Sequence, residues 1–302
     1  MVQLALVLVQ VFFASLAIIG RFVLPVVPPA ALVTFRIFGA AAALLLVNTI
    51  RGGPWITDRR ALLRAALAGL LGVTANQSLY LFGLQHTTAV NATILVTTVP
   101  VITVFGSLLL GLERPSRPKL VGIGLAALGA LYLVDPARLS FSSGVALGNL
   151  LILIGMICYA AYFLVSKPLV ARYDSITAST YVMLFAALGV LPIGVPALVG
   201  GNFHGISPTI WWLVAYVVLG PTIGAYFLNL WALRRASSNT VATFMYLQPL
   251  FAAAVAPLVL PGESLTGRTI LAGLTIFAGL GLVIRAEQQQ RLSLILEPGV
   301  GE

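Results

Sequence analysis

The sequence has little charge. Asp, Glu, Lys and Arg make up 8% of its 302 residues, whereas a soluble domain carries roughly a quarter. Because 60% of the residues are hydrophobic, the chain has too little polar surface to cover a water-exposed domain of this size. Spans of about 20 helical residues cross a hydrocarbon core of roughly 30 Å, and the apolar residues suffice for about ten such spans. The sequence therefore predicts an all-α membrane protein.

The signatures of common catalytic and nucleotide-binding sites are also missing. Cys158 is the single cysteine, which excludes an internal disulfide framework and a cysteine-based metal cluster. No HExxH, GxSxG, P-loop or dinucleotide-binding pattern occurs, so we predict no enzyme activity, no catalytic residue, no metal and no cofactor. The net charge of +9 comes from basic residues scattered over short loops, which argues against a nucleic-acid partner.

Ten apolar windows are long enough to cross a hydrocarbon core, which takes about 20 helical residues. Charged residues, Pro and Gly bound these windows. The predicted spans are 2–20, 30–50, 61–82, 88–111, 118–134, 144–166, 176–200, 208–230, 238–260 and 268–284.

Basic residues are distributed unevenly between the loops that follow even-numbered and odd-numbered spans. Thirteen follow even spans or lie in the C-terminal tail, and they are Arg51, Arg59, Arg60, Arg64, Arg114, Arg117, Lys119, Lys167, Arg172, Arg234, Arg235, Arg285 and Arg291. Three follow odd spans, namely Arg21, Arg138 and Arg268. Since short basic loops stay in the cytoplasm, both termini are predicted to be cytoplasmic.

The two halves of the chain resemble each other. Residues 80–100, YLFGLQHTTAVNATILVTTVP, align with residues 229–249, NLWALRRASSNTVATFMYLQP, so that Pro100 falls on Pro249. A second match aligns the triplet GVT at 72–74 with GPT at 220–222. These matches indicate a duplicated unit.

The number of spans in each unit determines how the copies are oriented. We predict repeats at 1–138 and 139–287 and a polar tail at 288–302. Each repeat has five spans, an odd number, so the second lies upside down relative to the first. Many secondary transporters are built from such inverted repeats and bind substrate near the midplane where the repeats meet. We call this interface the seam.

The ends of the repeats carry a family resemblance. LGLE at 110–113 and PGE at 261–263 each precede a Gly-rich fifth helix, and Arg36 follows PPA at 28–30. Over about residues 4–285, the chain resembles the EamA-type ten-helix members of the drug/metabolite transporter superfamily, and among them the YddG-like exporters of aromatic amino acids and methionine. The resemblance implies a multi-pass transporter of the bacterial inner membrane. The second half departs from symmetry, because Val182 stands at the position that matches Arg36.

Pro100 and Pro249 are predicted to be hinges. They lie about 12 and 11 residues into their spans, roughly 18 and 16 Å deep at ~1.5 Å per residue. Each lacks an N–H group and would leave a carbonyl unpaired one turn earlier, on Val96 and Met245. Static packing kinks are the alternative interpretation.

Polar and aromatic side chains gather on the same spans and suit an amphipathic ligand, because rings offer apolar contacts and amides offer hydrogen bonds. Contacts between helices would explain any single one of them equally well. The candidate substrate-binding residues are Asn76, Gln77, Tyr80, Asn91, Thr97, Tyr159, Tyr162, Tyr246 and Gln248, together with Arg36.

Arg36 is the one charge placed well inside a predicted span, about 9 Å from its outer end. No carboxylate lies at a similar depth, so its expected partners are backbone carbonyls, water or a substrate anion. Asp and Glu occur only in or next to loops and at the C-terminus. This distribution favours uncoupled transport or exchange over coupling to a proton or Na⁺.

Two further features have structural interpretations. Glu113 and Glu263 precede spans 5 and 10, where a negative charge favours the N-terminal dipole of the helix. Small residues on these two spans predict close packing, either with each other or in a dimer. They are Gly122, Ala126, Ala130, Thr275 and Gly279.

The sequence thus predicts a secondary transporter that exports small amphipathic metabolites, foremost aromatic or hydrophobic amino acids, by alternating access. Its expected partners are a small-molecule substrate and the lipid bilayer, and both a monomer and a dimer remain open. The alternatives are a proton-coupled transporter of drugs, nucleosides or organic cations, an intramembrane enzyme, and a channel.

Overall fold

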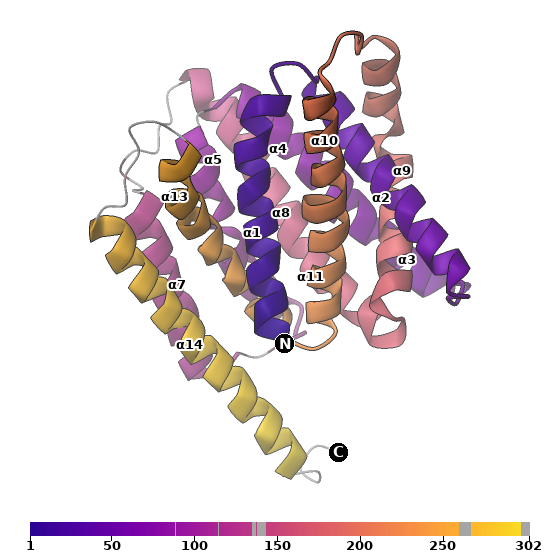
Figure 1. The fold of residues 1–302 in the computed structure, drawn as a ribbon. Helices are drawn as coiled ribbons and strands as arrows, with labels where there is room; N and C mark the ends of the chain where they lie inside the picture. The colour runs from indigo at the N-terminus through magenta and orange to yellow at the C-terminus, as the bar shows by residue number, and fades with distance from the viewer. Residues whose placement is uncertain (88, 114, 135–136, 138–142, 260–266, 297–302) are drawn as a thin grey trace.

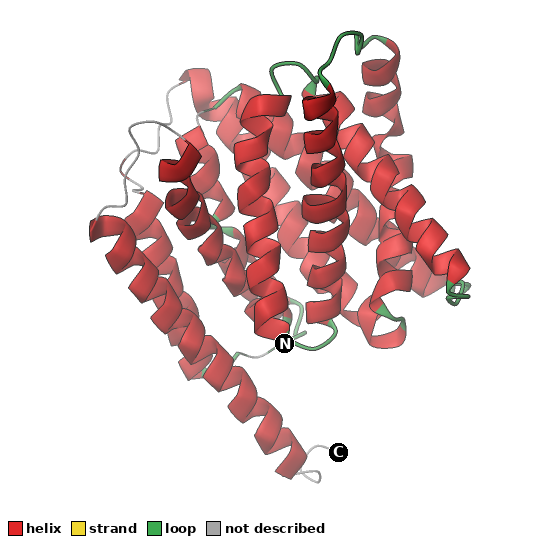
Figure 2. Cartoon of the chain, in the orientation of Figure 1, coloured by secondary structure: helices red, strands yellow, loops and turns green. Residues whose placement is uncertain are grey.

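The computed structural model of the chain is a bundle of helices (Figure 1). It describes residues 1–87, 89–113, 115–134, 137, 143–259 and 267–296, and these ranges contain no strand (Figure 2). The first half consists of α1 (Val2–Val23), α2 (Pro29–Ile50), α3 (Arg59–Gly69), the π-helical segment η1 (Leu70–Ala75), α4 (Asn76–Gln85), α5 (Ala89–Val96), α6 (Val99–Leu109) and α7 (Arg117–Val134). The second half consists of α8 (Ser143–Arg172), α9 (Ser175–Val199), α10 (Pro208–Val217), the π-helical segment η3 (Val218–Gly224), α11 (Ala225–Leu233), α12 (Ser238–Thr243), the 3₁₀ segment η4 (Phe244–Tyr246), α13 (Leu247–Val259) and α14 (Gly267–Leu296).

The predicted all-α fold with ten membrane spans is confirmed. Nine stretches of the described residues are long and apolar enough to cross a membrane. The tenth is the predicted span 238–260, which is divided into α12, η4 and α13. Helix α14 runs past its predicted end at 284 to Leu296, so the first part of the predicted polar tail is helical. The exact repeat boundaries stay a prediction.

The helices pack as an inverted pair of repeats requires. Second helices contact each other, α2 on α9, and so do fifth helices, α7 on α14. The first helices make reciprocal contacts, because α1 packs against α11 and α13 while α8 packs against α4 and α6. Such an exchange of equivalent contacts is the signature of a two-fold axis.

Local irregularities repeat as well. The π-helical segments η1 and η3 begin 148 residues apart and contain the two matching triplets. Spans 4 and 9 are both interrupted, at 97–98 and at 244–246. Because π turns are rare and often occur at functional sites, their equivalent positions in the two repeats make these segments candidates for the functional site.

Pro100 and Pro249 lie in the first turns of α6 and α13. The helices are interrupted before each proline, and the expectation of unpaired carbonyls at Val96 and Met245 stays a prediction. In span 4 the hydroxyls of Thr97 and Thr98 donate to the carbonyls of Ile94 and Leu95, at 2.6 Å in both cases. Each proline lacks the N–H group that would bond the carbonyl four residues earlier, and its ring crowds that turn, which accounts for interruptions at these places.

The small residues of α7 and α14 pack within the chain. A Cβ atom on Gly122 would lie 2.8 Å from the carbonyl oxygen of Gly279, and one on Gly279 would lie 2.6 Å from that of Gly122. Only glycine permits this approach of two backbones. The stripe therefore joins the fifth helices of the two repeats.

Candidate substrate-binding site

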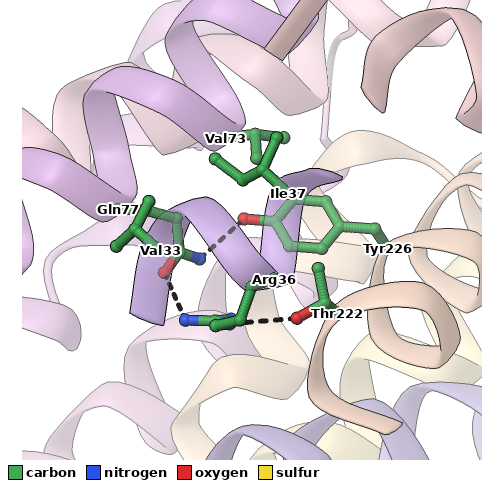
Figure 3. A pocket seen from close by; sticks show the side chains of 7 residues that line it. All are labelled: Val33, Arg36, Ile37, Val73, Gln77, Thr222 and Tyr226. Atoms are coloured by element: carbon green, nitrogen blue, oxygen red, sulfur yellow. Dashed lines mark hydrogen bonds between the residues drawn. The ribbon is translucent and has the colours of Figure 1, made fainter. Parts of the chain in front are cut away.

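The centre of the seam contains a continuous chain of polar contacts (Figure 3). The Nε atom of Arg36 on α2 donates to Oγ1 of Thr222 on η3 at 3.0 Å, and Nη1 donates to Oε1 of Gln77 on α4 at 2.8 Å. The Nε2 atom of Gln77 donates to the hydroxyl of Tyr226 on α11 at 2.9 Å. That hydroxyl donates to the carbonyl of Gly72 at 3.1 Å. The chain thus crosses between the two repeats at both of its ends.

The π-helical segments explain why these partners are available. A π turn leaves backbone groups without their usual helical partners, and the Gly72 carbonyl in η1 is bonded across the seam by Tyr226. In η3, Thr222 donates to the carbonyl of Val217 at 2.8 Å and so presents a lone pair to Arg36. Position 72 has room only for glycine, because a Cβ atom there would lie 2.3 Å from the ring of Tyr162.

Arg36 is 3% exposed, and its Nη2 atom has no hydrogen-bond partner. The sequence suggested backbone carbonyls, water or an anion as partners, whereas the observed acceptors are two neutral side chains, and an anion partner stays a prediction. The gap beside the guanidinium is too narrow to admit a water molecule. Its walls are Val33, Arg36, Ile37, Val73, Gln77, Thr222 and Tyr226.

An aromatic cluster adjoins the polar chain. We define it as Phe13, Tyr159, Tyr162, Phe163 and Tyr226. Tyr159 and Tyr162 are stacked with ring centroids 5.5 Å apart, and Tyr226 meets Tyr162 edge-on at 5.9 Å. Tyr226 belongs to both the cluster and the polar chain, so it joins an apolar surface to a charged one.

Of the predicted substrate-binding residues, the structure brings Arg36 and Gln77 into the polar chain and Tyr159 and Tyr162 into the aromatic cluster. Tyr246 is fully buried and its hydroxyl has no partner. Tyr80 and Gln248 are partly buried.

Three predicted residues have hydrogen bonds that already explain them. Asn76 donates to the carbonyl of Gly155 at 3.0 Å, and Asn91 donates to Thr87 and Asn149. Thr97 bonds within its own turn, as described above. These contacts fit the alternative that such residues hold helices together, and a role in substrate binding stays a prediction.

Sequence reasoning missed Thr222 and Tyr226. The available signal was the match of Gly220-Pro221-Thr222 with Gly72-Val73-Thr74, because Tyr226 lies four residues after Thr222 and therefore on the same helix face.

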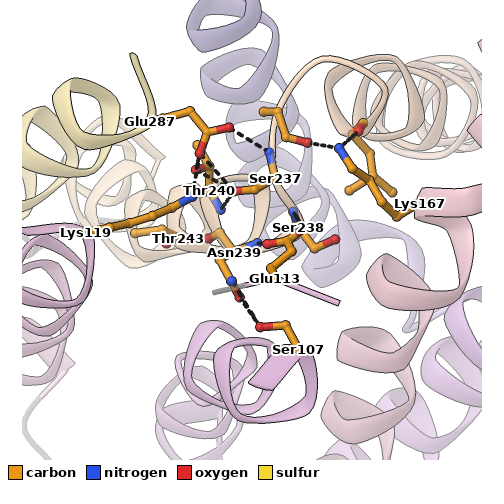
Figure 4. A network of polar contacts seen from close by, with 12 residues as sticks. Ser107, Glu113, Lys119, Lys167, Ser237, Ser238, Asn239, Thr240, Thr243 and Glu287 are labelled. Carbon is orange, nitrogen blue, oxygen red and sulfur yellow. Dashed lines mark hydrogen bonds and ion pairs between the residues drawn. The ribbon is translucent and has the colours of Figure 1, made fainter. Parts of the chain in front are cut away.

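A second polar site lies at the end of the bundle that holds the N-terminus and the loops after even-numbered spans, which we call the basic face (Figure 4). Lys119 is 2% exposed and pairs with Glu287 of α14. Glu287 also accepts from the hydroxyls of Ser237 and Thr240, at 3.0 and 2.9 Å. Lys119 is thus a second buried charge besides Arg36. Glu287 lies within a helix instead of next to a loop, which corrects the expected placement of the carboxylates.

Glu113 also corrects an expectation. It accepts from the backbone N–H groups of Ser238 and Asn239, at 2.6 and 3.3 Å, and so caps α12 instead of the helix that follows it in the chain. As expected, the carboxylate lies at the N-terminus of a helix, where the dipole favours a negative charge. The loop, however, turns it toward the free N–H groups of a different helix. Glu263 lies outside the described residues.

Comparison with known proteins identifies the family. The EamA-like transporter family matches residues 1–134 and 146–285, which is most of the chain in two parts. The chain belongs to the EamA-like transporter family. This confirms the resemblance to the drug/metabolite transporter superfamily, whereas the YddG-like subtype stays a prediction.

Several relatives of this EamA-family protein are named as transporters or exporters. An uncharacterized transporter of Archaeoglobus fulgidus is 28% identical over 75% of this chain and 78% of its own length. A probable terminal-alkyne amino-acid exporter of Streptantibioticus cattleyicolor is 29% identical over 73% and 72%. A WAT1-related protein of Arabidopsis thaliana is 26% identical over 95% and 82%.

The fold is also found in a solved structure. A crystal structure with 18% identity superposes with a TM-score of 0.76, over 95% of this chain and 98% of the other. The family match and the apolar helices together make the protein a multi-pass membrane transporter.

Proposed function

We propose that this protein exports small amphipathic metabolites, foremost amino acids with aromatic or hydrophobic side chains. One observation carries the proposal, which is that a buried guanidinium and an aromatic cluster meet at Tyr226 in the centre of the seam. A site with a few placed polar groups beside rings suits a ligand with one charged and one apolar end. The name of the Streptantibioticus relative supports the same substrate class.

Alternating access is the proposed mechanism. Two units of similar fold and opposite orientation can exchange conformations and open the seam first to one side of the membrane and then to the other. The narrow space around Arg36 supports a closed seam in the conformation described here. The interruptions before Pro100 and Pro249 supply the proposed hinges. In this proposal the basic face is cytoplasmic and the membrane is the bacterial inner membrane.

We propose uncoupled transport or exchange. The carboxylates among the described residues are Asp58, Glu113, Asp174 and Glu287, and each of them accepts hydrogen bonds at the basic face. Within the described ranges, Arg36 therefore has no carboxylate beside it that could relay a proton.

A proteoliposome assay with amino acids, nucleosides and organic cations tests the proposal. We expect saturable, protein-dependent flux of aromatic or hydrophobic amino acids down their own gradient, and an imposed pH gradient should leave net flux nearly unaltered. Strong proton-driven flux of organic cations would favour the alternative transporter class. Absence of saturable flux for every solute would contradict the transport proposal.

A further inference from the structure

The charge of Arg36 is only partly satisfied. Two of the three guanidinium nitrogens have neutral acceptors, whereas Nη2, with its two N–H groups, has none. A buried cation without a counter-ion is costly, because its attraction to a partner must replace the lost solvation. The site therefore keeps both a net charge and unused donors.

The surrounding contacts hold the guanidinium in place. Thr222 and Gln77 bind it from two repeats, and Gln77 is itself held by Tyr226. Gln77 belongs to the same repeat as Arg36 and keeps its contact when the seam widens, so the guanidinium is partly oriented before it binds an acceptor. Carboxylates match the planar guanidinium better than other common ligand groups of single charge.

We infer that Nη2 of Arg36 is the anchor for a carboxylate of the substrate and that the aromatic cluster beside it receives the apolar part. The inference rests on the proposed transport function and narrows its substrate class to aromatic or hydrophobic monocarboxylates, amino acids included. An organic cation is repelled by the same guanidinium, because no described carboxylate neutralises it. The substrate enters when the seam widens, since the space in the closed seam does not admit water.

Direct binding tests the inference with three probes that differ at one end. The carboxylate is 3-phenylpropionate, its neutral counterpart is 3-phenylpropanamide, and its cationic counterpart is 2-phenylethylamine. The full chain in lipid nanodiscs is titrated with each by calorimetry. We expect the carboxylate to bind about ten- to a hundredfold more tightly than the amide, as a charge-assisted hydrogen bond implies, and the amine to bind most weakly.

Variants assign the preference to one residue. Arg36→Gln should reduce the affinity for 3-phenylpropionate to that for the amide and leave the amide's affinity unchanged. Arg60→Gln is the matched control, because Arg60 is an exposed arginine at the basic face, and it should bind all three probes as the wild type does. Equal affinity of the carboxylate and the amide, or unchanged carboxylate binding in Arg36→Gln, would overturn the inference.

Gln77→Glu tests the same idea if Arg36→Gln does not fold. The new carboxylate lies beside Nη1 of Arg36 and forms an internal ion pair, which keeps the charge of Arg36 but supplies its counter-ion. We expect the affinity for 3-phenylpropionate to fall at least tenfold and the affinity for the amide to stay unchanged. Carboxylate binding at the wild-type level in this variant would contradict the inference.

The outcomes separate this inference from the transport proposal. If 3-phenylpropionate binds in an Arg36-dependent manner but no solute gives saturable flux, transport fails and the anchor stands. If amino-acid flux is saturable but is unaffected both by Arg36→Gln and by amidation of the carboxylate, the anchor fails and transport stands.

Discussion

Among the described residues, two cations are buried, Arg36 at the centre of the seam and Lys119 at the basic face, and they are equally hidden but differently satisfied. Lys119 is 2% exposed and donates to Glu287 and Ser237, so its charge is neutralised. Arg36 is 3% exposed and has only neutral acceptors for two of its nitrogens. Burial alone therefore does not identify a functional charge. A charge with complete partners joins helices, whereas one with incomplete partners retains bonding capacity for a ligand.

Removing Lys119 should have the largest effect on stability. Lys119→Met leaves the partly buried Glu287 without its cation, and we expect the free energy of unfolding to fall by about 3 kcal/mol, the lower end of the range for buried pairs. The double variant Lys119→Met/Glu287→Gln should recover most of this loss, because neither charge remains. Equilibrium unfolding in mild detergent measures both. A double variant no more stable than the single one would show that packing, and not charge, dominates at the basic face.

Tyr226→Phe should have the next largest effect, because Tyr226 joins the polar chain of the centre to the aromatic cluster. The change leaves the Gly72 carbonyl and the Gln77 amide without their partner, which costs about 1–3 kcal/mol. Affinity for carboxylates should fall as Gln77 loses its anchor. Tyr162→Phe is the matched control, since the Tyr162 hydroxyl has no partner and its removal should be neutral or stabilising. A similar loss in both variants would contradict a specific role for the polar chain.

Pro100→Ala and Pro249→Ala test whether the interrupted helices act as hinges when the seam opens. A proline in the first turn of a helix breaks no helical hydrogen bond, so we expect little change in stability. Continuous helices through 97–98 or 244–246 should nevertheless slow the opening of the seam and lower flux several-fold. Flux in proteoliposomes is the measurement. Unchanged flux in well-folded variants would assign both prolines to static packing.

The half-exposed pair Arg51–Asp174 should have the smallest effect. The two side chains are 30% and 32% exposed at a separation of 2.7 Å, and such pairs contribute about 0–1 kcal/mol. Asp174→Asn removes the charge but keeps the cap of α9, because Asn caps helices as well as Asp. We expect a loss below about 1 kcal/mol. A larger loss in thermal unfolding would make this pair as important for stability as Lys119–Glu287, and burial would then not explain the difference between charged pairs.

The same pair makes a pH-dependent contribution. Burial raises the pKa of the Asp174 carboxyl, but hydrogen bonds from Arg51 and Thr177 outweigh burial and lower the pKa from 3.8 to about 2. A lowered pKa means that the stabilisation is complete above 3.8 and is lost as the pH falls toward 2. The free energy of unfolding of Asp174→Asn should therefore lack this pH-dependent loss when it is measured over the same pH range.

The sequence predicted part of the candidate site. Arg36 and Gln77 were found because polar side chains in apolar spans are conspicuous. Thr222 and Tyr226 were missed because threonine and tyrosine are common in membrane helices and their importance depends on the neighbours they contact. Asn91 was a candidate by the same reasoning as Gln77, but its neighbours Thr87 and Asn149 satisfy it. Residue type shows that a partner is needed, and only packing decides which partner is present.

The sequence alone determined that the chain crosses a membrane ten times in two inverted halves, because exposure to lipid acts on every residue of a span and leaves a pattern that can be read along the chain. Tertiary structure decided which polar groups are satisfied. Arg36 meets Thr222 across 186 positions, Lys119 meets Glu287 across 168, and Glu113 caps a helix 125 positions away. Hydrogen bonds depend on distance and direction over a few ångströms, and the folded seam alone sets those distances.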